Sequence, residues 1–191
     1  MVKIIDVGFG NLLSLHYSLL DININNKIIN TPDQVEPKDK LLLPGVGSIK
    51  SYMRALKKTG FSKKISDHYS SNQLLIGICI GMHSLSNFSE EDKGVKCLQI
   101  FDTKVIKMRE GKNNGWLKIH LNNKFFKQKI HGRVFYNHEF GVIKNKNNLK
   151  FEKIPNTNYI SFIKKNNFYG IQFHPEKSQA TGLKILKQIL S

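Results

Sequence analysis

The chain has 191 residues, 40% of them hydrophobic and 10% aromatic, which is enough apolar material for one domain over residues 1–191 that folds without disulfides. No segment resembles a cleavable signal or reaches the ~18 consecutive apolar residues of a membrane helix, so we expect a cytoplasmic protein. The net charge of +16 comes from scattered lysines, which argues against nucleic acid and leaves a solvated surface, an acidic partner or a phosphorylated ligand.

The first half of the chain alternates predicted strands and helices. Apolar runs predict strands at residues 2–7, 27–30, 40–43 and 74–78. Helical spacing predicts helices at residues 11–20, 48–58 and 62–71. This alternation predicts an α/β fold with a mostly parallel central sheet and helices on both faces, in which the glycine turns after three of the strands lie at one edge.

The second half of the chain changes character. Short apolar runs separated by Asn, Lys and Gly turns predict strands at residues 103–108, 117–120, 132–136, 158–163 and 168–173. An amphipathic pattern predicts a closing helix at residues 180–190. We therefore expect an antiparallel portion added to the parallel sheet.

Cys79 lies between Gly77 and Gly81, where the strand at 74–78 is expected to give way to a helix. This pattern is typical of a nucleophile elbow, because glycines permit the sharp turn and a helix N-terminus favours a thiolate. The alternative is a small buried cysteine in a tight turn. Cys97 has no such setting, and the two cysteines lack the spacing of a disulfide or zinc framework, which predicts a reducing compartment and no metal site.

His174 and Glu176 are the candidate partners of this cysteine. A thiolate that attacks an amide needs a general base, and the base needs an orienting group. A spacing of two in an extended chain points both side chains to one face, and Pro175 keeps the link rigid. A lone His-x-Glu pair is a weak signal, but combined with the elbow it predicts a Cys-His-Glu triad.

Gly45, Val46 and Gly47 follow Pro44 at the end of a neighbouring predicted strand. Glycines at this place let backbone N–H groups approach a ligand, as an oxyanion hole requires. An ordinary Pro-Gly turn is the alternative.

Six segments that together span the chain resemble the class I (triad) glutamine amidotransferases, and within that family the glutaminase subunits of imidazole glycerol phosphate synthase. The segments are IIDVGFGNLLS at 4–14, LLLPGVGSI at 41–49, GICIGM at 77–82, NNGW at 113–116, VFYNHEF at 134–140 and FHPEKS at 173–178. GICIGM and FHPEKS are typical of the whole class, whereas IIDVGFGN and PGVG indicate the subfamily.

The resemblance implies a flavodoxin-like glutaminase that hydrolyses L-glutamine without a cofactor. It also implies a heterodimer with a HisF-like (β/α)₈-barrel cyclase of histidine biosynthesis, which receives the ammonia through a channel. By this likeness Cys79 is the nucleophile that forms a glutamyl thioester, His174 the acid/base and Glu176 its orienting partner. Residues 45–47 supply the oxyanion donor, and Gly81 lines the substrate region through its backbone.

Two positions depart from the family pattern. The residue after Gly81-Met82 is commonly a substrate-holding glutamine in the family, and here it is His83. The family's His-Ser-Tyr motif is replaced by His138-Glu139-Phe140. His83 and His138 are therefore either substrate contacts or neutral substitutions.

Three other functions remain open at this point. Divergent relatives of this subunit supply ammonia for amidination of a surface-polysaccharide sugar, which is the main alternative acceptor. A non-catalytic regulatory partner of a barrel protein is a second alternative, since it needs the fold but not the chemistry. A cysteine hydrolase of another class on a similar scaffold would keep the elbow, but it would not need PGVG or FHPEK.

Overall fold

Eleven strands form one central sheet and two more form a separate hairpin in the computed structural model, which describes residues 1–145 and 149–191. The parallel part of the sheet has five neighbouring strands. In spatial order they are β2 (Asn26–Ile29), β1 (Val2–Ile5), β3 (Lys40–Leu43), β4 (Leu75–Ile78) and β13 (Phe168–Ile171). The order 2-1-3-4-13 matches that of flavodoxin-like sheets.

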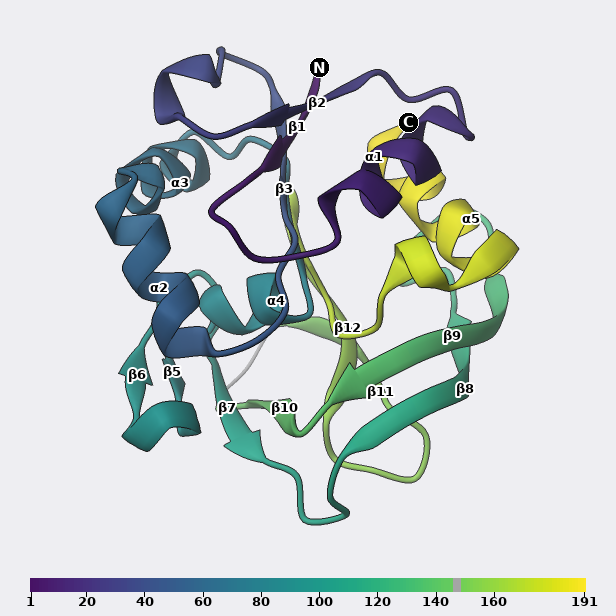
Figure 1. Ribbon diagram of the computed structural model, residues 1–191. Helices are drawn as coiled ribbons and strands as arrows, with labels where there is room; N and C mark the ends of the chain where they lie inside the picture. The colour runs from purple at the N-terminus through teal and green to yellow at the C-terminus, as the bar shows by residue number, and fades with distance from the viewer. Residues whose placement is uncertain (146–148) are drawn as a thin grey trace.

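Helices cover both faces of these parallel strands (Figure 1). The helices α1 (Leu12–Leu20) and α5 (Gln179–Leu190) lie on one side, and α2 (Ile49–Lys58) and α3 (Phe61–Ser70) lie on the other. A fifth helix, α4 (Ile80–Ser84), begins directly after Cys79. Because both faces are covered, every residue of β1 and β4 is buried, which explains their largely apolar sequences.

The sheet continues into an antiparallel part beyond β13. It contains β12 (Ile160–Lys165), β10 (Phe140–Lys144), β7 (Thr103–Lys107), β5 (Phe88–Ser89) and β6 (Val95–Lys96), with β11 (Lys150–Lys153) paired to β12. The β5–β7 pair is the exception, being parallel. The separate hairpin joins β8 (Asn113–Leu121) to β9 (Ile130–His138), and β9 packs against α5.

Three short 3₁₀ turns complete the described elements: η1 (Pro32–Gln34), η2 (Glu91–Lys93) and η3 (Pro175–Lys177). Two of them border the site described below. The turn η2 contains Asp92 in a left-handed conformation, and η3 follows His174.

The α/β class, the parallel core and the antiparallel addition are confirmed, but several boundaries were wrong. The strands expected at 2–7 and 168–173 end earlier, at Ile5 and Ile171. The hairpin strands are longer than the expected 117–120 and 132–136. Strands β5, β6, β10 and β11 were not predicted, since two are only two residues long and β10 contains Gly141, a weak strand former.

Candidate active site

Cys79 lies at a sharp turn between β4 and α4. Its backbone has φ 53° and ψ −111°, a conformation that is unusual for a residue with a side chain, and its N–H donates to the Ile171 carbonyl at 2.7 Å. A Cβ on Gly77 would lie 2.6 Å from the Gly81 carbonyl oxygen, and a Cβ on Gly81 would overlap the Leu43 carbonyl oxygen. Both flanking glycines are therefore required by packing, as in a nucleophile elbow.

His174 and Glu176 lie together at the end of β13. The His174 Nδ1 and the Glu176 Oε1 are 2.9 Å apart, and both side chains are buried. The link between them is not extended as expected: Pro175–Lys177 is a 3₁₀ turn with His174 at its N-cap. Proline at the first position of such a turn has a suitable fixed φ, so the turn, rather than strand alternation, brings the carboxylate to the imidazole.

The hairpin strand β9 holds this segment in place. The His174 N–H donates to the Phe135 carbonyl at 2.9 Å, and the Ser178 hydroxyl donates to the His174 carbonyl at 2.6 Å. The same hydroxyl accepts a bond from the Phe135 N–H at 3.0 Å. The backbone of His174 is thus fixed on both sides.

Cys79 is one of the groups that set the pKa of His174. Burial alone lowers the pKa of the imidazole, but hydrogen bonds to the Cys79 and Glu176 side chains and the negative charges of both raise the pKa to about 10. The structure therefore favours a protonated His174 ring at neutral pH, next to the Cys79 and Glu176 side chains. Burial raises the pKa of the Cys97 thiol to about 12, so that cysteine is not activated in this way.

Residues 44–47 pass beside this group at the end of β3. The Tyr52 hydroxyl, on α2, donates to the Pro44 carbonyl at 2.8 Å. A Cβ on Gly45 would lie 2.9 Å from the Tyr52 ring, so Gly45 packs closely against Tyr52. Among residues 1–145 and 149–191, no hydrogen-bond acceptor is found for the N–H groups of residues 45–47, which leaves them available to a ligand.

A cavity of about 310 Å³ lies next to Cys79. Its lining residues are Val46, Gly47, Cys79, Ile80, His83, Glu91, Lys112, Asn137, His138, Glu139 and Phe140. The cavity therefore brings together five of the candidate residues, whereas Gly45 and Gly81 pack beneath the turns and His174 and Glu176 are buried without lining it. Glu91 and Lys112 were not selected from the sequence, because they come from segments without a recognisable pattern, and Asn137 was not singled out within the segment VFYNHEF.

His83 and His138 are both neutral in this environment. Burial lowers the pKa of each to about 4. The His83 Nε2 lies 2.9 Å from the Gln172 Oε1, while its Nδ1 has no partner among the described residues. The His138 Nδ1 lies 2.8 Å from the Phe140 carbonyl, which it can reach only as a donor, so its Nε2 is the acceptor.

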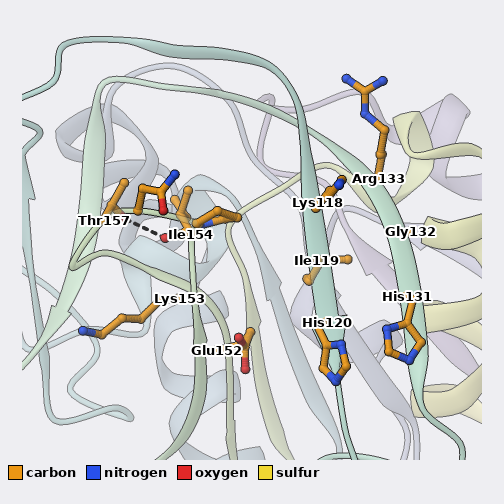
Figure 2. Close-up of a pocket in the computed structure, with 12 residues that line it drawn as sticks. Lys118, Ile119, His120, His131, Gly132, Arg133, Glu152, Lys153, Ile154 and Thr157 are labelled. Carbon is orange, nitrogen blue, oxygen red and sulfur yellow. Dashed lines mark hydrogen bonds between the residues drawn. The ribbon is translucent and has the colours of Figure 1, made fainter.

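A larger cavity of about 660 Å³ lies elsewhere (Figure 2). It is bordered by the hairpin, with His120 and His131 side by side, and by residues 152–157. Cys79 and His174 do not line it. Size alone therefore does not identify the site, and the chemistry of the smaller cavity does.

Neither a metal cluster nor a membrane helix is found in the described part of the chain. Within 1–145 and 149–191, no group of three or more His, Cys, Asp or Glu side chains could hold a metal ion. Over the same ranges, no helix has the length and apolar character needed to cross a bilayer.

Comparison with known proteins places the chain in a family. The model of the family "Glutamine amidotransferase class-I" matches residues 3–190. Proteins named imidazole glycerol phosphate synthase subunit HisH 2 from Methanococcus maripaludis and subunit HisH from Escherichia coli K12 are each 34% identical to the chain. The alignments cover 100% and 99% of this chain and 98% of each relative.

Solved structures agree on the fold. The PurLQS structure from Thermotoga maritima matches with a TM-score of 0.78 at 18% identity, covering 99% of this chain and 96% of that one. A putative GMP synthase protein from Thermoplasma acidophilum matches with a TM-score of 0.70 at 22% identity, covering 99% and 91%. By the family match and the full-length relatives, the chain belongs to the class I glutamine amidotransferases.

Proposed function

We propose that this chain is the glutaminase subunit of an imidazole glycerol phosphate synthase, acting as one domain over residues 1–191. The names of the relatives that match its full length support this function, and so does membership of the amidotransferase family. The observation that carries the proposal is the group formed by Cys79, His174 and Glu176, in which the His174 Nδ1 lies 2.9 Å from the Glu176 Oε1 and both Cys79 and Glu176 raise the pKa of the imidazole.

The geometry supports a thioester mechanism. The Cys79 thiolate attacks the amide carbon of glutamine, and N–H groups of residues 45–47 donate to the oxyanion that forms. His174, as imidazolium, gives its proton to the leaving nitrogen, so ammonia departs and a glutamyl thioester remains. His174 then takes a proton from water, the hydroxide attacks the thioester, and glutamate leaves while the thiolate and imidazolium are restored. Glu176 holds the imidazole in one orientation throughout.

The cavity next to Cys79 fits the charges of an α-amino acid. Glu91 and Glu139 line it together with Lys112, so both signs of charge are present. A free amino acid carries an ammonium and a carboxylate, and opposite charges in the wall match such a zwitterion. The neutral His138 ring adds an acceptor at its Nε2, which lies 3.5 Å from the Asn113 Nδ2.

The ammonia is passed to a partner in this proposal. The relatives are subunits by name, so we infer a heterodimer with a HisF-like barrel cyclase in the cytoplasm. Ammonia would reach the cyclase through a channel within this complex. The net charge of +16 supports an acidic docking surface on that barrel, because opposite charges steer association.

Glutamate release from the purified chain, alone and with a HisF-like barrel cyclase, tests the proposal. We expect slow release alone and faster release in the complex, in which the partner is expected to complete the orientation of the N–H groups of residues 45–47 that the chain itself holds at both ends. Cys79→Ala should abolish release and leave complex formation intact. Turnover by Cys79→Ala would show that another residue is the nucleophile.

The same assay separates the enzyme from a non-catalytic partner. If the chain releases no glutamate in either condition while a control glutaminase is active, the proposed function is rejected. A non-catalytic regulatory partner of a barrel protein would then be the supported function. The acceptor of the ammonia is identified by analysing the product that the complex forms. An aminated histidine-pathway product supports the proposal, and an amidinated sugar supports the alternative acceptor.

A further inference from the structure

The loop around Asp92 holds the first turn of α2. One carboxylate oxygen of Asp92 accepts hydrogen bonds from the Ser48 hydroxyl at 2.5 Å and from the Lys50 N–H at 3.2 Å. A carboxylate oxygen of Glu91 lies 3.4 Å from the Ile49 nitrogen and accepts its N–H. Ser48 is the N-cap of α2, so the cap and two free N–H groups of the helix are bound by a segment far along the chain.

The backbone of this loop is strained. Asp92 and Lys93 have φ values of 54° and 67°, and Gly94 follows at 100°. The left-handed region is unfavourable for residues with a side chain, and two in succession persist only where surrounding contacts fix them. The β5–β6 pairing on either side of the loop and the bonds to α2 are such contacts. In this conformation the Asp92 carboxylate reaches the start of α2.

The bound helix start directly follows residues 45–47. Pro44, on one side of them, is held through its carbonyl by the Tyr52 hydroxyl at 2.8 Å. Ser48, on the other side, is held by Asp92. Both ends of the segment are thus fixed by hydrogen bonds, whereas its own N–H groups have no acceptor among the described residues. The orientation of these peptide groups depends on the two fixed ends.

We propose that Asp92 is a positioning residue that keeps the N–H groups of residues 45–47 directed at the oxyanion, by fixing the N-terminus of α2. The inference rests on the proposed glutaminase function. Asp92 does not line the cavity, so it acts through Ser48 and the helix rather than on the substrate. Its neighbour Glu91 lines the cavity and also accepts from α2, so the loop joins the substrate region to the helix.

Steady-state kinetics of three variants in the complex test this role. Asp92→Ala should lower kcat for glutamine hydrolysis about tenfold, part of the roughly 10²- to 10³-fold loss seen when an oxyanion donor is removed outright. KM should change less than about twofold, because the substrate contacts remain. Asp92→Asn keeps an acceptor oxygen and should recover most of the lost kcat.

Glu90→Ala is the matched control. Glu90 is an acidic residue of the same loop, but it pairs with Lys104 at 2.7 Å and does not contact α2. This variant should keep the wild-type kcat. Equal kcat values for Asp92→Ala and Glu90→Ala, in a preparation whose wild type is active, would overturn the positioning role.

Hydrogen exchange gives a readout that does not need activity. The amides of Ile49 and Lys50, which donate to Glu91 and Asp92, should exchange faster in Asp92→Ala than in the wild type or Glu90→Ala when exchange is followed by mass spectrometry. Unchanged exchange would overturn the inference even if the chain were no glutaminase, whereas an inactive wild type with faster exchange in Asp92→Ala would reject only the proposed function. Should Asp92→Ala fail to fold, Ser48→Ala, which removes the Ser48–Asp92 bond and leaves the bond from the Lys50 N–H, takes its place in both experiments, with a smaller effect expected.

Discussion

Cys79 illustrates how single residues create the site. Its positive φ costs of order 1–3 kcal/mol in a residue with a side chain, and such strain persists only where neighbours enforce it. The neighbours here are Gly77 and Gly81, which bring β4, α4 and the Leu43 carbonyl into contact. Placing the sulfur at a helix start therefore depends on two positions that cannot carry a Cβ.

Gly81→Ala should destabilise the fold by about 4 kcal/mol or more, because the new methyl group overlaps a backbone oxygen that cannot move freely. Urea denaturation measures the loss. Gly111→Ala is the comparison: φ there is 80° but nothing lies within 4 Å, so a cost of about 1 kcal/mol is expected. Similar losses in the two variants would show that the close approach at Gly81 relaxes.

Glu176→Gln should lower kcat by roughly 10²- to 10⁴-fold, as in other triads that lose the acidic member. The reason is that the carboxylate charge helps raise the pKa of His174, so the pKa should fall when the charge is removed. Kinetics in the complex and an NMR titration of the His174 ring measure the two effects. Glu152→Gln, which removes an acid paired with Lys124, serves as the control and should change neither.

At the scale of elements, the candidate active site lies at the carboxyl ends of three parallel strands. Cys79 follows β4, His174 lies beyond the end of β13, and Pro44 follows β3, so one edge of the parallel sheet supplies all three parts. The hairpin β8–β9 then fixes His174 through Phe135. The helix α2 fixes Pro44 through Tyr52.

Tyr52→Phe should reduce the free energy of unfolding by about 1–2 kcal/mol, since the buried Pro44 carbonyl loses its donor while the ring still fills its place. Urea denaturation tests this. Tyr17→Phe, on the exposed face of α1, is the control and should leave stability unchanged. A loss in Tyr52→Phe no larger than in Tyr17→Phe would indicate that water replaces the hydroxyl.

At the scale of the whole molecule, stability should depend on pH through two buried histidines. His83 and His138 have pKa values lowered from 6.5 to about 4, so the unfolded chain binds more protons than the folded one between these values. The contribution of these two histidines to stability therefore falls as the pH drops from about 6.5 toward 4. Each of these histidines lowers the free energy of unfolding by about 2 kcal/mol at pH 5 relative to pH 7.

His83→Gln removes one of these groups and should lose about 2 kcal/mol less than the wild type between pH 7 and pH 5. Glutamine can still bond Gln172, so folding is expected to be retained. Unfolding free energies at the two pH values give the result. Identical pH dependence in both proteins would mean that His83 is charged in the folded state.

Much of the fold was accessible from the sequence, and the exceptions have physical causes. Long apolar runs such as 40–43 and 74–78 predict strands because both their faces are buried. Strands β5, β6 and β11 lie at or next to sheet edges and are short or half-exposed, so tertiary pairing rather than their own pattern makes them strands.

The residue types of the candidate site were also accessible, because a cysteine between glycines and a histidine near a carboxylate have chemical meaning at short range. Cys79, His174 and Glu176 could be chosen on that basis. The contact between Cys79 and His174 could not, since the two are far apart in the chain and only the pairing of β4 with β13 brings them together. Glu91 and Lys112 in the cavity, and Asp92 at α2, depend on loop geometry that no local pattern encodes.

The sequence by itself determined the α/β alternation, the glycine turns and the choice of a candidate nucleophile with its candidate partners, because these follow from local sterics, periodicity and the chemistry of the residue types. Only the tertiary structure decided that Glu176 reaches the imidazole through a 3₁₀ turn and that both pocket histidines are neutral. It also decided that the loop around Asp92 forms hydrogen bonds to the start of α2, directly after residues 45–47. Hydrogen bonds between distant segments and burial depend on the packed chain as a whole, and no stretch of sequence contains them alone.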